Sequence, residues 1–435
     1  MFPFIKHYLG KPFIRNVAII AGGAAATQII QIGFSPIITR LYGPEVFGVL
    51  GVILSVVAII SPISTLCYDY SIVMPEKKAD GLLLLKLSII IALLVSSVSC
   101  IIFIIFQSWI SLSLNIGDAY YLIYFIPIII FLSSLARVNE QWLVRTKRFK
   151  TTATIGVIKA LLVGSSKSGL GLIYPTATAL VGLSSAGHGL HALLTSYVTR
   201  DTKKDASKSI QNSDGFIENK MKSLAYEYRD FPFFRAPQVF INSVSRNLPV
   251  LMFTTLFGPA VVGYYVIAHR VLKLPASLIN AAVGKVFVQR IAEASHRGEN
   301  LRSLIIRTTL GMAAVGIIPF LIIIAFGPWI FGFVFGSQWT IAGDYARWLS
   351  LWLFFGFINV PSVAAIPFLS MQGKFLVFEI FSVIIRIFAI TIGALVFKNE
   401  LYSIIMFSVS GFILNFILIL WTIYNSKYNI RKLNT

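Results

Sequence analysis

The stretch TRLYGPEVFGVLG at residues 39–51 recurs in this chain as TTLFGPAVVGYYV at residues 254–266. Six residues are identical at one constant offset: a threonine, a leucine, the Gly-Pro pair, a valine and a second glycine. Proline is favoured at the first position of a helix, so each copy predicts one helix ending and another beginning. The chain is therefore expected to contain two copies of one helical unit.

The composition predicts that these helices lie in a membrane. Of the 435 residues, 57% are hydrophobic and only 12% are charged, with a mean hydropathy of +0.81. A soluble globular protein is roughly half apolar and about a quarter charged. A chain of this length has too few charged residues to cover a water-soluble surface, so the predicted fold class is an all-α polytopic membrane protein.

A membrane-spanning helix needs roughly 20 mostly apolar residues. Twelve segments of the chain meet that length. They are residues 15–39, 46–68, 84–106, 119–141, 152–173, 175–198, 237–257, 262–285, 304–325, 342–368, 375–397 and 402–424. No small-residue cleavage site follows a short apolar core near the N-terminus, so the first segment is expected to be a transmembrane helix and not a signal peptide.

Lysine and arginine residues predict the orientation, since they are enriched in cytoplasmic loops. They gather around residues 77–78, 145–150, 199–235, 286–303 and 427–432, whereas the alternate loops carry only Arg40 and Lys398. Both termini are therefore expected in the cytoplasm. Most of the net charge of +20 is then explained by the orientation of the helices in the membrane. The same basic residues can also contact anionic membrane lipids. No nucleic-acid partner is expected, because no basic folded domain carries these charges.

The two copies of the repeat are separated by six predicted spans, so both halves share one orientation. This arrangement implies a pseudo-twofold axis along the membrane normal, as in transporters built from parallel repeats. The expected domains are a six-helix bundle at 1–198, a linker at 199–229, a second six-helix bundle at 230–424 and a cytoplasmic tail at 425–435. The linker is polar and low in aromatic residues, and is expected to be flexible.

Basic residues within the predicted spans are candidates for a substrate site, because charges at membrane depth are costly and usually functional. Arg246, Arg270, Lys273 and Arg386 are the predicted contacts of an anionic ligand. Arginine suits phosphate oxygens, which it binds in a bidentate manner. Lys159 and Lys167 interrupt the fifth span and are either cavity residues or side chains that extend to the interface.

Acidic residues in the spans are fewer. Asp69, Glu140 and Glu379 lie near predicted cytoplasmic helix ends, and Asp344 lies near an outer end. Each is either a proton or sodium site, or a partner for a neighbouring arginine or lysine. The excess of positive charge at depth favours an anionic substrate and disfavours the lipophilic cations of drug efflux.

Enzyme chemistry is not indicated. The sequence has no GxGxxG, P-loop or HExxH motif, and its short outward loops hold no group of acids and histidines. Cys67 and Cys100 lie in apolar segments and suggest neither a metal site nor a disulfide. No cofactor, metal or catalytic residue is expected.

Several strings resemble one family, the polysaccharide-biosynthesis (Wzx-type) flippases of the multidrug/oligosaccharidyl-lipid/polysaccharide superfamily. They are TRLYGPEVFG at 39–48, YDYSIVMPEKKADGLLLLKLS at 68–88, the run from YRDFPFFRAPQVF to NAAVGKVF at 226–287, and FGSQWTIAGDYARWLSLW at 335–352. The resemblance covers nearly the whole chain and is weakest at 152–225. Where the family pattern has Tyr-Glu after the second span, this chain has Tyr68-Asp69.

The resemblance implies a MATE-like fold that flips undecaprenyl-pyrophosphate-linked oligosaccharide across the bacterial cytoplasmic membrane. The substrate units would serve O-antigen in lipopolysaccharide, capsule or exopolysaccharide synthesis. The pyrophosphate would bind in a cationic central cavity with alternating access, and a polysaccharide polymerase and a chain-length regulator would be partners. The alternatives are a drug/cation antiporter of the same superfamily, a lipid II flippase and a membrane polysaccharide polymerase.

Overall fold

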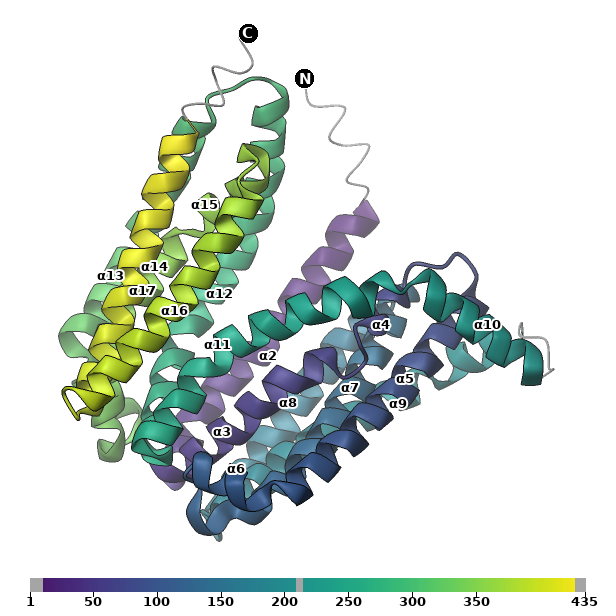
Figure 1. Ribbon diagram of the computed structural model, residues 1–435, viewed down its shortest axis with the longest axis horizontal. Coiled ribbons are helices and arrows are strands. Elements are labelled where there is room, and N and C mark those ends of the chain that lie inside the picture. The colour runs from purple at the N-terminus through teal and green to yellow at the C-terminus, as the bar shows by residue number, and fades with distance from the viewer. Residues whose placement is uncertain (1–10, 209–213, 427–435) are drawn as a thin grey trace. The chain divides into compact units, whose positions relative to one another are not determined.

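The computed structural model describes residues 11–208 and 214–426, and in this part of the chain every regular element is a helix. The chain divides into two compact units, Met1–Pro259 and Ala260–Thr435. Figure 1 shows the long helices that make up each unit. Twelve helices in the described part exceed 16 residues, and each overlaps one of the twelve predicted spans.

Unit 1 holds seven of these long helices. They are α2 (Lys11–Leu41), α3 (Pro44–Ile60), α5 (Lys78–Ile105), α7 (Phe125–Arg145), α8 (Phe149–Gly171), α9 (Ala177–Lys208) and α11 (Ala236–Phe257). Shorter elements join them: η1 (Ser61–Ile63), α4 (Tyr68–Ser71), α6 (Gln107–Ser113), η2 (Gly117–Tyr124), α10 (Asp214–Glu227) and the π-helical turn η3 (Phe231–Arg235). In the packing, α2 lies along α8, α7 contacts both α9 and α5, and α11 lies along α3.

Unit 2 continues with α12 (Pro259–His296), α13 (Leu301–Phe335), η4 (Ser337–Trp339) and α14 (Thr340–Ile358). The chain then passes through α15 (Val360–Ala365) and η5 (Ile366–Leu369) to α16 (Gln372–Leu395) and α17 (Glu400–Asn425). Within this unit α13 packs on α14, while α17 contacts both α14 and α16.

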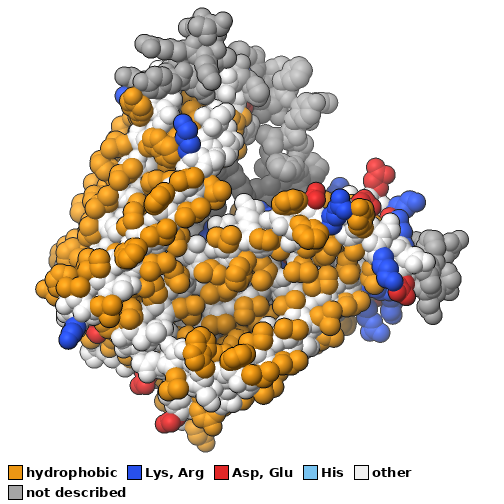
Figure 2. All heavy atoms as spheres, viewed as in Figure 1, with side chains coloured by type: hydrophobic (Ala, Val, Ile, Leu, Met, Phe, Trp, Pro, Cys, Tyr) orange, Lys and Arg blue, Asp and Glu red, His pale blue; other side chains and the backbone are white. Residues whose placement is uncertain are grey.

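Seven described segments are long and apolar enough to cross a membrane. They are Pro44–Ile63, Lys78–Ile105, Gly117–Arg145, Leu301–Phe335, Ser337–Leu369, Gln372–Leu395 and Glu400–Asn425. Many large apolar side chains on these helices are exposed, including Leu94 and Ile105 on α5 and Phe388 on α16. Figure 2 shows hydrophobic side chains spread over the visible face of each unit, while charged side chains gather around α10. Such extended apolar surfaces are what lipid contact requires.

The segment predicted as a flexible linker is helical wherever it is described. Helix α9 continues to Lys208, and α10 occupies Asp214–Glu227; residues 209–213 lie outside the described part. Residues 199–208 and 214–227 are thus helical, in a segment that the sequence alone predicts to be a polar linker. Polar composition does not reveal the few apolar residues that anchor a helix.

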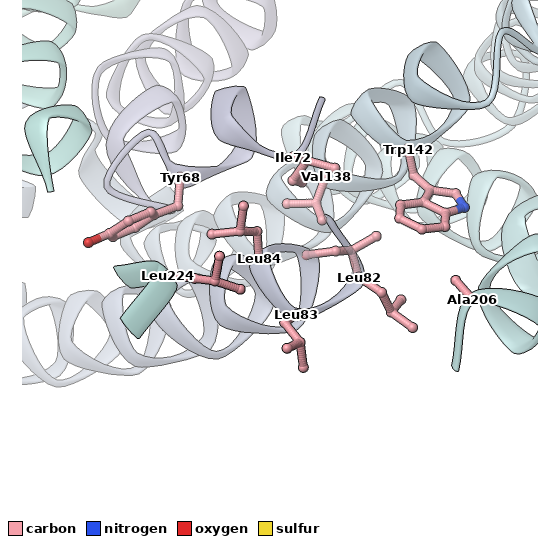
Figure 3. Packing of buried hydrophobic residues seen from close by; sticks show 10 residues of the cluster. Tyr68, Ile72, Leu82, Leu83, Leu84, Val138, Trp142, Ala206 and Leu224 are labelled. Atoms are coloured by element: carbon pink, nitrogen blue, oxygen red, sulfur yellow. The ribbon is translucent and has the colours of Figure 1, made fainter. Parts of the chain in front are cut away.

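One buried cluster explains why α10 is ordered. Leu224 is 2% exposed and belongs to one buried cluster with the leucines of α5, Leu82 to Leu85; Figure 3 shows Leu224 beside Leu84. The Tyr68 hydroxyl donates a 2.9 Å hydrogen bond to the carbonyl oxygen of Ala225. Lys220 adds a 3.9 Å ion pair with Asp80. Apolar burial thus fixes α10 against the first turns of α5.

The repeated stretch occupies the same place in both halves of the sequence. Helix α2 ends at Leu41 and α3 begins at Pro44, while α11 ends at Phe257 and α12 begins at Pro259. The prediction that each Gly-Pro pair starts a helix is confirmed. The glycines differ, however, because Gly43 has an ordinary extended conformation with φ of −71° and Gly258 has a positive φ of 91°.

Candidate functional site

Three of the four predicted contacts of an anionic ligand lie in unit 2. Arg270 and Lys273 are exposed residues of α12, three residues apart and so about 4.5 Å along the helix axis. Arg386 is half-buried on α16, with its guanidinium carbon 5.7 Å from the centroid of the Trp352 ring. The face of an indole ring attracts a cation, so Trp352 stabilises a positive charge at this point of the unit.

Trp352 belongs to a set of stacked rings from three helices. The imidazole of His269 on α12 stacks on Trp352 at a centroid distance of 5.8 Å and on Tyr265 at 5.6 Å. Phe407 on α17 meets the Trp352 ring edge-on at 4.8 Å. Trp352 itself fits because residue 411 is glycine: a Cβ atom there would lie 2.5 Å from the indole. The rings of His269 and Phe407 pack on Trp352 and fix its position, and the Arg386 guanidinium lies over the Trp352 ring.

The fourth predicted contact, Arg246, lies in unit 1. It is an exposed residue of α11, three residues before Pro249, which lies inside the same helix. Among the described residues Arg246 forms no ion pair with a carboxylate. The four predicted cations are thus divided between the two units, one in unit 1 and three in unit 2.

In unit 1 the structure brings together two residues that were predicted separately, Glu140 and Lys159. The link is His191 on α9, whose Nε2 atom lies 3.1 Å from Oε1 of Glu140 on α7. Its Nδ1 atom lies 3.5 Å from Nζ of Lys159 on α8. Lys167 is two turns further along α8 and half-buried, and its carbonyl oxygen accepts a hydrogen bond of 3.2 Å from the Tyr42 hydroxyl.

Asp69 is fully buried and is paired with a basic residue. Nε of Arg137 on α7 lies 3.1 Å from Oδ2 of Asp69, and the Thr65 hydroxyl donates a 2.6 Å hydrogen bond to Oδ1. Arg137 also donates to the carbonyl oxygen of Ser61. This network connects α7 to the bend that follows α3, where Leu66 and Cys67 have positive φ angles.

The two remaining predicted acids lie in unit 2. Oδ1 of Asp344 lies 3.5 Å from the NH1 nitrogen of Arg347 on the same helix, and this arginine also donates to the carbonyl oxygen of Ala325 at 3.0 Å. Glu379 is half-buried on α16, about two turns before Arg386. Within residues 11–208 and 214–426 no three histidine, cysteine, aspartate or glutamate residues form a group that could hold a metal ion.

Sequence reasoning missed three residues of these networks: Arg137, His191 and His269. Arg137 lies inside the predicted span 119–141, so the criterion that selected Arg246 would also have selected it. The two histidines lie inside predicted spans, but the sequence does not show which groups face them. Their roles depend on contacts between helices that are far apart in the chain.

The comparisons with known proteins agree with this architecture. Residues 37–344 match the family described as "Polysaccharide biosynthesis protein". No curated protein matches the sequence. Among solved structures, the fold resembles a multidrug resistance MATE family transporter of the MOP superfamily in its inward-facing conformation. The identity is 15%, the alignment covers 93% of this chain and 96% of that one, and the TM-score is 0.70.

Two further structures share the fold. The lipid II flippase MurJ, in an inward closed conformation, aligns at 13% identity over 93% of this chain and 87% of that one, with a TM-score of 0.68. The eukaryotic MATE transporter AtDTX14 aligns at 13% identity over 96% and 97% of the two chains, with a TM-score of 0.53. At these identities the likeness shows the fold alone. The family match covers well over half of the chain, so this protein belongs to the polysaccharide biosynthesis protein family and has the MATE-like fold of a multi-pass membrane protein.

Proposed function

We propose that this protein flips undecaprenyl-pyrophosphate-linked oligosaccharide units from the inner to the outer leaflet of the bacterial cytoplasmic membrane. The family supports a role in polysaccharide biosynthesis, for O-antigen, capsule or exopolysaccharide. A structure with the same fold is a lipid II flippase by its name. The substrate here would be a lipid-linked oligosaccharide handled before a polysaccharide polymerase and a chain-length regulator.

One observation carries the proposal: three of the four predicted acids lie beside basic side chains, whereas the six predicted basic residues outnumber the four acids. Asp69 pairs with Arg137, Glu140 with His191 and Asp344 with Arg347. A drug/cation antiporter needs a carboxylate for its cationic substrate, and each of these three carboxylates lies beside a basic side chain. The basic residues Arg246, Arg270, Lys273 and Arg386 favour an anionic headgroup, since pyrophosphate oxygens accept several charge-assisted hydrogen bonds.

The mechanism proposed is alternating access with twelve transmembrane helices, in bundles at 1–198 and 230–424, and with both termini in the cytoplasm. The cations would bind the pyrophosphate, while the polyprenyl tail stays in lipid. Arg386 on its aromatic stack would be the most precisely positioned of these groups. The remaining cations lie at the surface of their helices, where a headgroup can reach them.

The test uses cells that lack this protein and accumulate its lipid-linked substrate. They are complemented with the native chain, with Arg246→Ala/Arg270→Ala, or with Lys222→Ala/Arg297→Ala. The second pair removes two exposed charges outside the long apolar helices and serves as the matched control. Complete repeat units should build up on the cytoplasmic face with the first pair and disappear with the control pair and the native chain.

Two outcomes would count against the proposal. If the Arg246→Ala/Arg270→Ala protein, expressed at the native level, clears the accumulated units, the cations do not bind the headgroup. If single repeat units reach the outer face of cells without this protein and only polymer is missing, the protein acts in polymerisation and not in transport.

A further inference from the structure

Glu140, His191 and Lys159 form a continuous chain of a carboxylate, an imidazole and an ammonium group. The three residues come from three packed helices, α7, α9 and α8. His191 stands between the other two, with Nε2 at 3.1 Å from Glu140 and Nδ1 at 3.5 Å from Lys159. The His191 side chain is 17% exposed and that of Glu140 is 36% exposed, so neither is fully enclosed by the protein.

The hydrogen-bonding properties of Glu140 and Lys159 determine which tautomer a neutral His191 adopts. A carboxylate only accepts hydrogen bonds and an ammonium group only donates them. Nε2 therefore carries the hydrogen and donates it to Glu140, while Nδ1 has a lone pair that accepts from Lys159. In this form the three groups have no net charge, and Lys159 is held against the imidazole.

When neutral His191 takes up one additional proton, its attractive contact with Lys159 becomes repulsive. Protonation at Nδ1 converts the acceptor into a donor, so that two donors with positive charges face each other at 3.5 Å. Glu140 still accepts from Nε2 and keeps the imidazolium in place. The group that must move is the ammonium of Lys159, which ends a flexible four-carbon side chain.

The polar contacts of the His191 side chain are with Glu140 and Lys159. On its own three helices, Arg137 is paired with Asp69, Lys167 and His188 are bases, and the remaining acids are Asp201 and Asp205 on α9. Helix α2, which packs along α8, has no charged residue between Asn16 and Thr39. The other elements that pack on α9 are α3, α5 and η2, and they contribute Glu45, Lys78, Asp80, Lys86 and Asp118.

We propose that His191 is a proton-operated latch for Lys159. When His191 is neutral, the latch holds Lys159 against the imidazole; when Nδ1 takes up one proton, the ammonium group is released and can bind an anionic ligand. Only one N–H bond forms, and both Lys159 and Glu140 keep their charges. This inference rests on the proposed function only in making that ligand the phosphate of the transported lipid. It identifies His191 as a positioning residue that acts through Lys159.

The first experiment observes the latch without any substrate. The protein, labelled with ¹⁵N at histidine and lysine, is placed in lipid nanodiscs and titrated by NMR. His191→Gln and Lys159→Arg variants assign the signals, and His188→Gln serves as the control from the same helix. Neutral His191 should carry its hydrogen on Nε2, and the Nζ signal of Lys159 should shift with the same midpoint as the protonation of Nδ1.

In the His191→Gln protein the Lys159 signal should no longer follow that midpoint, whereas the His188→Gln protein should behave like the native one. A neutral His191 with its hydrogen on Nδ1 would overturn the latch. So would a Lys159 signal that titrates identically with and without His191. Neither result depends on what the protein transports.

The second experiment measures flipping of the lipid-linked oligosaccharide in proteoliposomes as a function of pH. The native rate should rise as pH falls through the midpoint found by NMR, and the rate of the His191→Gln protein should not change there. The His188→Gln protein should keep the native profile. If the native and His191→Gln proteins have the same pH profile, the latch has no role in transport. A failure of the proposed function appears differently, as flipping absent from native protein at every pH.

Discussion

Gly48 on α3 lies so close to Pro259 that a Cβ atom on residue 48 would be 1.7 Å from the Pro259 carbonyl oxygen. Both residues belong to copies of the repeated stretch, Gly48 to the first and Pro259 to the second. A residue of the first copy therefore packs directly on a residue of the second, and both lie within unit 1.

Gly48→Ala is expected to destabilise the protein. The added methyl group would meet backbone atoms, which cannot rotate away, and overpacking of this kind costs about 1–3 kcal/mol. Gly43→Ala is the matched control, since a Cβ atom at residue 43 meets nothing within 4 Å. Thermal unfolding of the purified proteins in detergent should show a lower midpoint for Gly48→Ala alone. Equal midpoints for the two variants would mean that Gly48 and Pro259 are not packed this closely.

Gly258→Ala should also be destabilising, but for a different reason. At residue 258 φ is 91° and ψ is 178°, a region used almost only by glycine, and another residue costs about 1–3 kcal/mol there. The nearest atom to the new Cβ would be Nδ2 of Asn115 at 3.4 Å, so the cost arises in the backbone. Gly43→Ala again provides the comparison, at the equivalent place in the first copy. A native unfolding midpoint for Gly258→Ala would contradict this backbone conformation.

Asp69→Asn should destabilise the protein more than the double substitution Asp69→Asn/Arg137→Gln, which removes both charges of the pair. Asp69 is fully buried and the side chain of Arg137 is 23% exposed, so the single change leaves a poorly solvated guanidinium without its carboxylate. Breaking a buried pair in this way costs about 3–5 kcal/mol, whereas removing both partners costs less. Unfolding midpoints of Asp69→Asn, Arg137→Gln and the double variant form a double-mutant cycle. Additive effects in that cycle would show that the two side chains are not coupled.

Leu224→Ala should release α10 from α5. Leu224 is 2% exposed, and truncation of a buried leucine to alanine costs about 2–5 kcal/mol. The most direct measurement is limited trypsin digestion, which should cut faster after Lys220 and Lys222. Asn219→Ala alters an exposed position of the same helix and should leave the cleavage rate unchanged. If Leu224→Ala is cut no faster than native protein, α10 is held by contacts other than the leucine cluster.

The candidate site was only partly predictable. Lysines, arginines and acids inside apolar segments are visible in a sequence, because each interrupts a hydrophobic run. Glu140 and Lys159 were found in this way, but as separate groups. Their connection needs His191, which stands 51 positions after Glu140 and 32 after Lys159 in the chain. Which side chains meet is decided by the rotation and packing of three helices, and neither can be read from spacing along one helix.

The sequence by itself determined the membrane character, the helical class and the places where helices begin at Gly-Pro. These features depend on local composition and on backbone preferences within a few residues. Only the tertiary structure decided that α10 is anchored, that Asp69 pairs with Arg137, and that Gly43 and Gly258 differ in conformation. Each of these depends on atoms brought together from distant parts of the chain, and identical residues in two copies of a repeat then meet different surroundings.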